Sequence, residues 1–98
     1  MAKTAEGRVK DDVKKLLTKH NAWHYWPVVT GYGRRTLDCI GCHRGRFFAV
    51  ETKRADLEMT PLQQEHAAEM TAAGAAVFRV NAVDGLDQLE EWLNENTR

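Results

Sequence analysis

Asp38, Glu51 and Lys53 are the residue types that could hold a divalent cation and place an amine beside it. Carboxylate oxygens are ligands that Mg²⁺ binds in proteins. Two carboxylates facing each other across neighbouring strands repel, so a cation between them is needed. Glu51 and Lys53 are two residues apart, and a strand therefore places both side chains on one face. These three residues predict a metal site if the fold brings them together.

A β-hairpin is the element that would do so. Residues 46–52 are aromatic and β-branched enough to form a strand, and residues 37–43 are a weaker segment that can pair with it. Arg44-Gly45 lies between them as a two-residue link, with glycine where a tight hairpin needs a positive φ. The register of such a hairpin places Asp38 directly opposite Glu51, with β-carbons roughly 4.5–5.5 Å apart.

This arrangement resembles the PD-(D/E)xK nuclease superfamily, in which an Asp is followed on the next strand by Glu-x-Lys. Here those positions are Asp38 and Glu51-Thr52-Lys53. The Gly-Tyr-Gly at 31–33, the segment IGCHRGRFFAVETKR and the helix start TPLQ are similar to the VRR-NUC branch, which includes phage-type nucleases and Holliday-junction-resolvase-like domains. The similarity runs from about residue 6 to residue 80. Leu37 stands where the superfamily name has Pro, a structural position that often varies.

The resemblance implies a Mg²⁺-dependent DNA endonuclease, with Mn²⁺ able to substitute. Asp38 and Glu51 would hold the metal, and the Thr52 carbonyl would add an oxygen ligand. Lys53 would orient the attacking water or stabilise the developing negative charge. The substrate would be DNA, with branched or Holliday-junction-like forms included, and a homodimer would present the two sites that junction cleavage needs.

Glu6 and Gln63 each have a structural and a functional interpretation. Glu6 lies at the inward edge of a predicted helix over residues 4–20, where it would favour the helix dipole. The resemblance adds the option that it binds the metal. Gln63 completes a capping box with Thr60 at the start of a later helix. Related domains also place a glutamine near the cleft, so both roles stay open.

The loop between the first two predicted strands is rich in glycine and arginine. Tyr32, Arg34 and Arg35 are the expected contacts to DNA, because the glycines allow close approach and arginine can grip a phosphate bidentately. A mobile turn is the alternative. The GxxxxGK[ST] pattern of nucleotide-hydrolysing proteins is absent.

The segment Cys39-Ile40-Gly41-Cys42-His43 spells the motif used to attach c-type haem. A strand would point its two cysteines to opposite faces, which disfavours haem, and a second ligand pair at zinc spacing is missing. Cysteines packed as small residues in a strand are the preferred interpretation. A zinc or haem protein, and a non-catalytic DNA-binding module, remain the alternatives to a nuclease.

Length and charge are consistent with one domain over residues 1–98. Residues 1–54 carry 12 Lys and Arg against 5 Asp and Glu, whereas residues 55–98 carry 2 against 9. The net charges of +7 and −7 predict a basic face that carries the candidate site. The charged N-terminus and the lack of a membrane-length apolar segment predict a cytoplasmic protein of a bacterial or phage-infected cell.

The predicted order is helix, three strands, helix, strand, helix. It gives an α/β fold with a mixed β-sheet flanked by helices, which resembles the restriction-endonuclease-like core. The first strand is the aromatic run at 23–29, where Pro27 argues for an edge position. We assign most of its aromatic rings to the core, with stacking on bases as the alternative use.

Overall fold

A computed structural model describes residues 4–28 and 36–95 of the chain. Within these ranges the elements follow the predicted order. They are α1 (Ala5–Lys19), β1 (Trp23–Tyr25), β2 (Cys39–His43), β3 (Arg46–Thr52), α2 (Pro61–Ala72), β4 (Ala76–Val80) and α3 (Leu86–Glu95).

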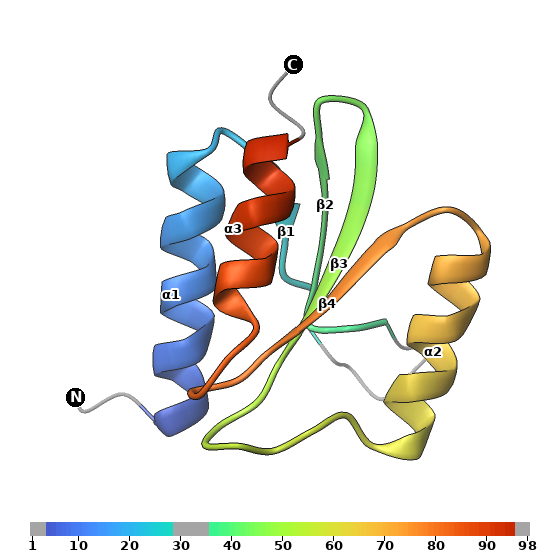
Figure 1. The fold of residues 1–98 in the computed structure, drawn as a ribbon. Coiled ribbons are helices and arrows are strands. Elements are labelled where there is room, and N and C mark those ends of the chain that lie inside the picture. The colour runs from blue at the N-terminus through green and yellow to red at the C-terminus, as the bar shows by residue number, and fades with distance from the viewer. Residues whose placement is uncertain (1–3, 29–35, 96–98) are drawn as a thin grey trace.

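The four strands form one mixed sheet in the order β1-β2-β3-β4. The first three strands are antiparallel neighbours, and β4 runs parallel to β3 because α2 returns the chain between them. Figure 1 shows α1 and α3 side by side on one side of the sheet and α2 on the other. The predicted fold class, a mixed sheet flanked by helices, is confirmed.

Helix α1 forms because its apolar residues recur on one stripe and its start is capped. The Thr4 hydroxyl accepts a hydrogen bond from the Gly7 N–H at 2.9 Å. The observed helix spans Ala5–Lys19, which agrees with the predicted range of residues 4–20 to within one residue at each end. Its buried stripe consists of Val9, Val13, Leu16 and Leu17.

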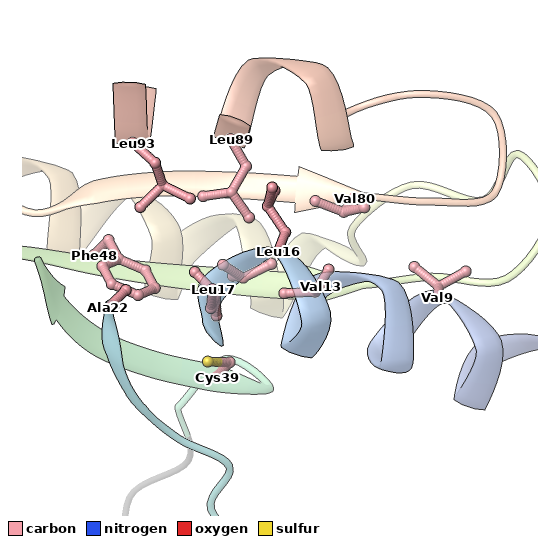
Figure 2. Close-up of a cluster of buried hydrophobic side chains, with 11 residues drawn as sticks. Val9, Val13, Leu16, Leu17, Ala22, Cys39, Phe48, Val80, Leu89 and Leu93 are labelled. Atoms are coloured by element: carbon pink, nitrogen blue, oxygen red, sulfur yellow. The ribbon is translucent and has the colours of Figure 1, made fainter. Parts of the chain in front are cut away.

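The hydrophobic core lies between this stripe, α3 and one side of the sheet. Figure 2 shows side chains from α1, α3 and three strands meeting there. Phe48 of β3 is fully buried in this core, as are Leu89 and Leu93 of α3. The core sits on the α1/α3 side, and it orients β3 so that alternate residues face the opposite side.

The first strand differs from its prediction in length and in burial. It ends at Tyr25, because Pro27 has no N–H to continue the ladder, and residue 29 lies outside the described ranges. It is an edge strand, as predicted. The assignment of most of its aromatic rings to the core is wrong, since Trp23 is 63% and Tyr25 53% exposed. Trp26 is half-buried against the core.

Helix α2 begins where the capping box predicted, with Thr60 as the N-cap and Pro61 in the first helical position. It ends before Gly74, whose φ of 104° suits glycine. None of its residues is buried. In the part of the chain that the structure describes, no helix is long and apolar enough to span a membrane.

Candidate active site

The β2–β3 hairpin has the predicted turn and register. Arg44 and Gly45 both have positive φ, 51° and 83°, and His43 pairs with Arg46. The regular pairing runs back to Cys39 opposite Val50. Asp38 and Glu51 are therefore the next residues in register, at the point where backbone pairing stops.

Side chains replace the backbone ladder at this point. The Asp38 N–H donates to Oε1 of Glu51 at 3.1 Å. In return, Oδ2 of Asp38 accepts from the Thr52 N–H at 3.0 Å and from the Thr52 hydroxyl at 2.7 Å. The hairpin end is thus closed by two carboxylates, each of which accepts a backbone N–H from the other strand.

Thr52 has a role that the sequence did not predict. The metal-ligating carbonyl stays a prediction, and in addition the Thr52 N–H and hydroxyl donate to the carboxylate of Asp38. The predicted alternation places Thr52 on the core side of β3, and the residue is fully buried. Alternation alone could not show this contact, because it arises only where the strand pairing ends.

Glu51 is the buried centre of the site, with 4% of its surface exposed. Its Oε2 accepts a hydrogen bond from Nε2 of Gln63 at 3.0 Å and lies 3.8 Å from Nζ of Lys53. Burial, and then the negative charge of Asp38, raise the pKa of the Glu51 carboxyl to about 7. The Asp38 N–H and the Lys53 ammonium oppose this rise without cancelling it.

Gln63 forms the predicted capping box and also contacts Glu51 of the candidate site, and its functional role stays a prediction. Its Oε1 accepts from the Thr60 N–H at 2.9 Å, and the Thr60 hydroxyl accepts from the Gln63 N–H at 3.3 Å. The amide nitrogen then reaches Glu51. The first turn of α2 is therefore attached directly to the site.

Glu6 lies at the margin of this group. It forms an ion pair with Lys10 at 3.6 Å, and its charge contributes to the raised pKa of Glu51 only as the weakest of the named causes. Within residues 4–28 and 36–95, no group of three or more His, Cys, Asp or Glu side chains is close enough to hold one metal ion, so Glu6 does not join Asp38 and Glu51 in such a group. A metal-binding role for Glu6 stays a prediction.

The predicted DNA contacts Tyr32, Arg34 and Arg35 lie outside the described residues. The structure thus brings together Asp38, Glu51, Lys53 and Gln63. Thr52 joins this group through its hydrogen bonds to Asp38, and Glu6 lies at its margin.

The donor set fits a small hard cation. Asp38 and Glu51 supply carboxylate oxygens from adjacent positions, and Mg²⁺ is commonly bound through one or two carboxylates with waters completing its shell. Burial of Glu51, and then the negative charge of Asp38 beside it, raise the pKa of the Glu51 carboxyl. A bound cation would relieve the repulsion between the two carboxylates.

Comparison with known proteins identifies the fold. No family model matches the sequence, and no curated protein matches it. A solved structure described as a VRR_NUC domain superposes with a TM-score of 0.72, and the match covers 98% of this chain and 100% of the other at 23% identity. The chain has the fold of a VRR_NUC domain. The resemblance inferred from the hairpin motif is confirmed at the level of the fold.

Within this VRR_NUC fold, the CIGCH segment is strand β2. Cys39 is buried on the core side and Cys42 is exposed on the other, as alternation predicted. Burial raises the pKa of the Cys39 thiol to about 12, which opposes formation of a metal-binding thiolate. The His43 ring nitrogen Nε2 lies 3.2 Å from the His20 carbonyl oxygen. This geometry does not favour the zinc or haem alternative.

Proposed function

We propose that this protein is a metal-dependent nuclease that hydrolyses phosphodiester bonds in DNA. The observation that carries the proposal is the meeting of Asp38, Glu51, Lys53 and Gln63 at the end of one hairpin in a VRR_NUC fold. A structural ion pair between Glu51 and Lys53 does not need a second carboxylate beside it, whereas the half-buried Asp38 stands where a cation site would use one.

Mg²⁺ is the proposed cofactor, with Mn²⁺ as a substitute. Asp38 and Glu51 would hold it, with the Thr52 carbonyl and Glu6 as further oxygen ligands. When bound, the metal polarises the scissile phosphate and lowers the pKa of a water molecule.

The side chains of the chain itself do the positioning. Thr52 holds one carboxylate oxygen of Asp38 through two hydrogen bonds, which restricts the rotation of that carboxylate. Gln63 holds Oε2 of Glu51 in the same way. Lys53 is only 14% exposed, so its ammonium acts in a poorly solvated place where it stabilises negative charge on a phosphate strongly.

The proposed partner is DNA, branched forms included, bound by the basic N-terminal half of the chain. A homodimer is proposed because one small protomer carries one site, whereas symmetric cleavage of a junction needs two. We propose a cytoplasmic location.

The decisive experiment is cleavage of a panel of linear, nicked, flapped and four-way-junction DNAs with Mg²⁺ or with EDTA. Lys53→Ala should lower the cleavage rate by about 10²-fold or more, as loss of a charge-stabilising donor does. Lys19→Ala is the matched control, because this lysine is 72% exposed and pairs only with Glu90 across the α1–α3 contact.

Equal cleavage by the wild type and Lys53→Ala, or undiminished cleavage in EDTA, would contradict the mechanism. Binding of DNA without cleavage of any substrate would instead favour the non-catalytic DNA-binding module.

A further inference from the structure

An aromatic row crosses the sheet on the side that faces away from the core. Trp23 of β1 pairs with Cys42 of β2, and Cys42 pairs with Phe47 of β3. Cross-strand partners point to the same side of a sheet. Cys42 is exposed while its neighbour Cys39 faces the core three residues earlier, so the row lies on the α2 side.

The rings of this row are open to solvent. Trp23 is 63% exposed and Phe47 45%. Tyr25, two residues along β1 on the same side, is 53% exposed. The rings of Trp23 and Tyr25 are nearly parallel, with an interplanar angle of 16° and centroids 6.4 Å apart. We call Trp23, Tyr25 and Phe47 the aromatic row.

Single exposed apolar residues are ordinary on protein surfaces. The aromatic row differs because it lies on the same side of the sheet as the candidate active site, with buried Ala49 between Phe47 and Glu51. Phe47 and Glu51 are four residues apart on β3 and point to the same side, which is about 13 Å along the strand. A strand of several nucleotides lying on the row is long enough to span this distance and reach the site.

The charges around the row indicate what kind of molecule this is. Arg44 is exposed at the hairpin turn, next to the row, whereas the guanidinium of Arg46 lies over the Trp92 ring on the α3 side of the sheet. Lys53 and the exposed Arg54 stand at the other end of β3. Cations at both ends with flat apolar rings between them fit a chain of phosphates that carries flat apolar groups, which is a nucleic-acid strand.

A hollow beside Phe47 adds a place for one such group. It measures about 420 Å³ and lies between the hairpin turn and the end of α2, with Phe47, Arg46 and Met70 among its lining residues. Its volume is within the range of small-molecule sites, and its lining offers an aromatic ring and a thioether.

We propose that the aromatic row is a stacking surface for about two or three unpaired nucleotides of the DNA strand that enters the candidate active site. The bases of a duplex are stacked on one another, so their faces are closed to protein rings, whereas unpaired bases can stack on aromatic side chains. The preferred substrate is then DNA with a single-stranded segment beside the scissile bond. This inference rests on the proposed nuclease function.

The test is equilibrium binding in EDTA, where no cleavage is expected, measured by fluorescence anisotropy. The probes are a labelled single strand of about 12 nucleotides, within the usual site size, and a blunt duplex of the same length. Trp23→Ala should weaken binding of the single strand by about 5- to 100-fold and leave duplex binding within about 2-fold. Trp23→Phe should retain most of the affinity, because a ring remains.

Val83→Ala is the control for loss of an exposed apolar side chain, since Val83 is 72% exposed in the segment before α3. It should bind both probes as the wild type does. The salt dependence of single-strand binding should be unchanged in Trp23→Ala, because stacking releases no counterions whereas phosphate contacts do. Trp23 is an exposed edge-strand residue, and a thermal melt verifies that the variant folds.

Three results would overturn the proposal: equal loss of single-strand and duplex binding, no loss in Trp23→Ala, or a dimer that dissociates in this variant. The last would mean that a second copy of the chain covers the row. Cleavage is measured separately. If the wild type cleaves DNA and Trp23→Ala does not weaken single-strand binding, only the stacking proposal is contradicted. If Trp23→Ala weakens single-strand binding selectively but the wild type shows no Mg²⁺-dependent cleavage, only the nuclease proposal is contradicted.

Discussion

The two sides of the sheet differ in almost every physical respect. On the α1/α3 side, Phe48 and Val50 are fully buried among aliphatic side chains (Figure 2). On the α2 side, the covering helix has no buried residue, and the sheet carries exposed rings as well as the buried carboxylate of Glu51. Adjacent residues of β3 therefore face two different environments, a packed apolar core and a more polar, partly exposed surface.

The difference between the two sides separates the residues that stabilise the fold from those of the candidate site. The α1/α3 side removes apolar surface from water, which is the dominant favourable contribution to folding. The α2 side buries Glu51 and keeps it close to Asp38; burial and then the charge of Asp38 raise the pKa of Glu51, which costs folding free energy at neutral pH. A functional site commonly tolerates such a cost.

The largest expected effect contrasts neighbours on β3. Phe48→Ala should lower the free energy of unfolding by about 3–5 kcal/mol, because it leaves a cavity in a packed core. Phe47→Ala, on the other side, should cost less than about 1 kcal/mol because its ring is half-exposed. Urea denaturation measures both, and equal losses would break the comparison.

Stability should depend on pH through Glu51. Its pKa in the folded protein is about 7, above its ordinary value of 4.5, so the folded state binds the proton more tightly than the unfolded state does. The resulting stabilisation is present below pH 4.5 and is lost as pH rises toward about 7. In metal-free buffer this decline should be about 2–3 kcal/mol. Subtracting the profile of Glu51→Gln isolates the contribution, and identical profiles would contradict it.

Added Mg²⁺ should raise the stability of the folded protein by about 1–3 kcal/mol at 10 to 100 times its dissociation constant. The increase should be larger at pH 8 than at pH 5, because a proton on Glu51 competes with the cation. Thermal denaturation with and without Mg²⁺ measures it. A matched gain in Glu51→Gln would place the binding elsewhere.

The smallest expected effects concern Gln63. Gln63→Ala should lower stability by about 1 kcal/mol through loss of the cap, whereas Gln63→Glu can keep the capping box. Gln63→Glu should still lower nuclease activity by about 10-fold or more, because it faces Glu51 with a like charge. Gln64→Ala is the control, since its side chain bonds only the Met59 carbonyl. Equal activity of Gln63→Glu and the wild type would assign Gln63 to the cap alone.

Local rules predicted much of the fold. A two-residue link containing glycine gave the hairpin register, and Thr60-Pro61 with Gln63 gave the start of α2. Both depend on residues within a few positions of each other. The same register brought Asp38 to Glu51, so the centre of the site could also be predicted.

Other features depend on packing and could not be predicted. Trp23 and Tyr25 are the apolar residues that a pattern assigns to a core, yet the only helix on their side, among the described residues, leaves them exposed. The contact of Thr52 with Asp38 forms where the β2–β3 backbone pairing ends, and the alternation of residues along a strand does not predict such a contact. Residues 32, 34 and 35 stay predictions because they lie outside the described ranges.

The capping box at the start of α2 fixes the orientation of the Gln63 side-chain amide relative to the candidate site. Since Oε1 of Gln63 is engaged by the Thr60 N–H, its amide group cannot rotate by 180° without breaking the cap. The NH₂ end is therefore the one presented to Glu51. Because Oε1 of Gln63 accepts from the Thr60 N–H, it is not available to bind a cation. Gln63 therefore contributes to the candidate site as a hydrogen-bond donor as long as the first turn of α2 is formed.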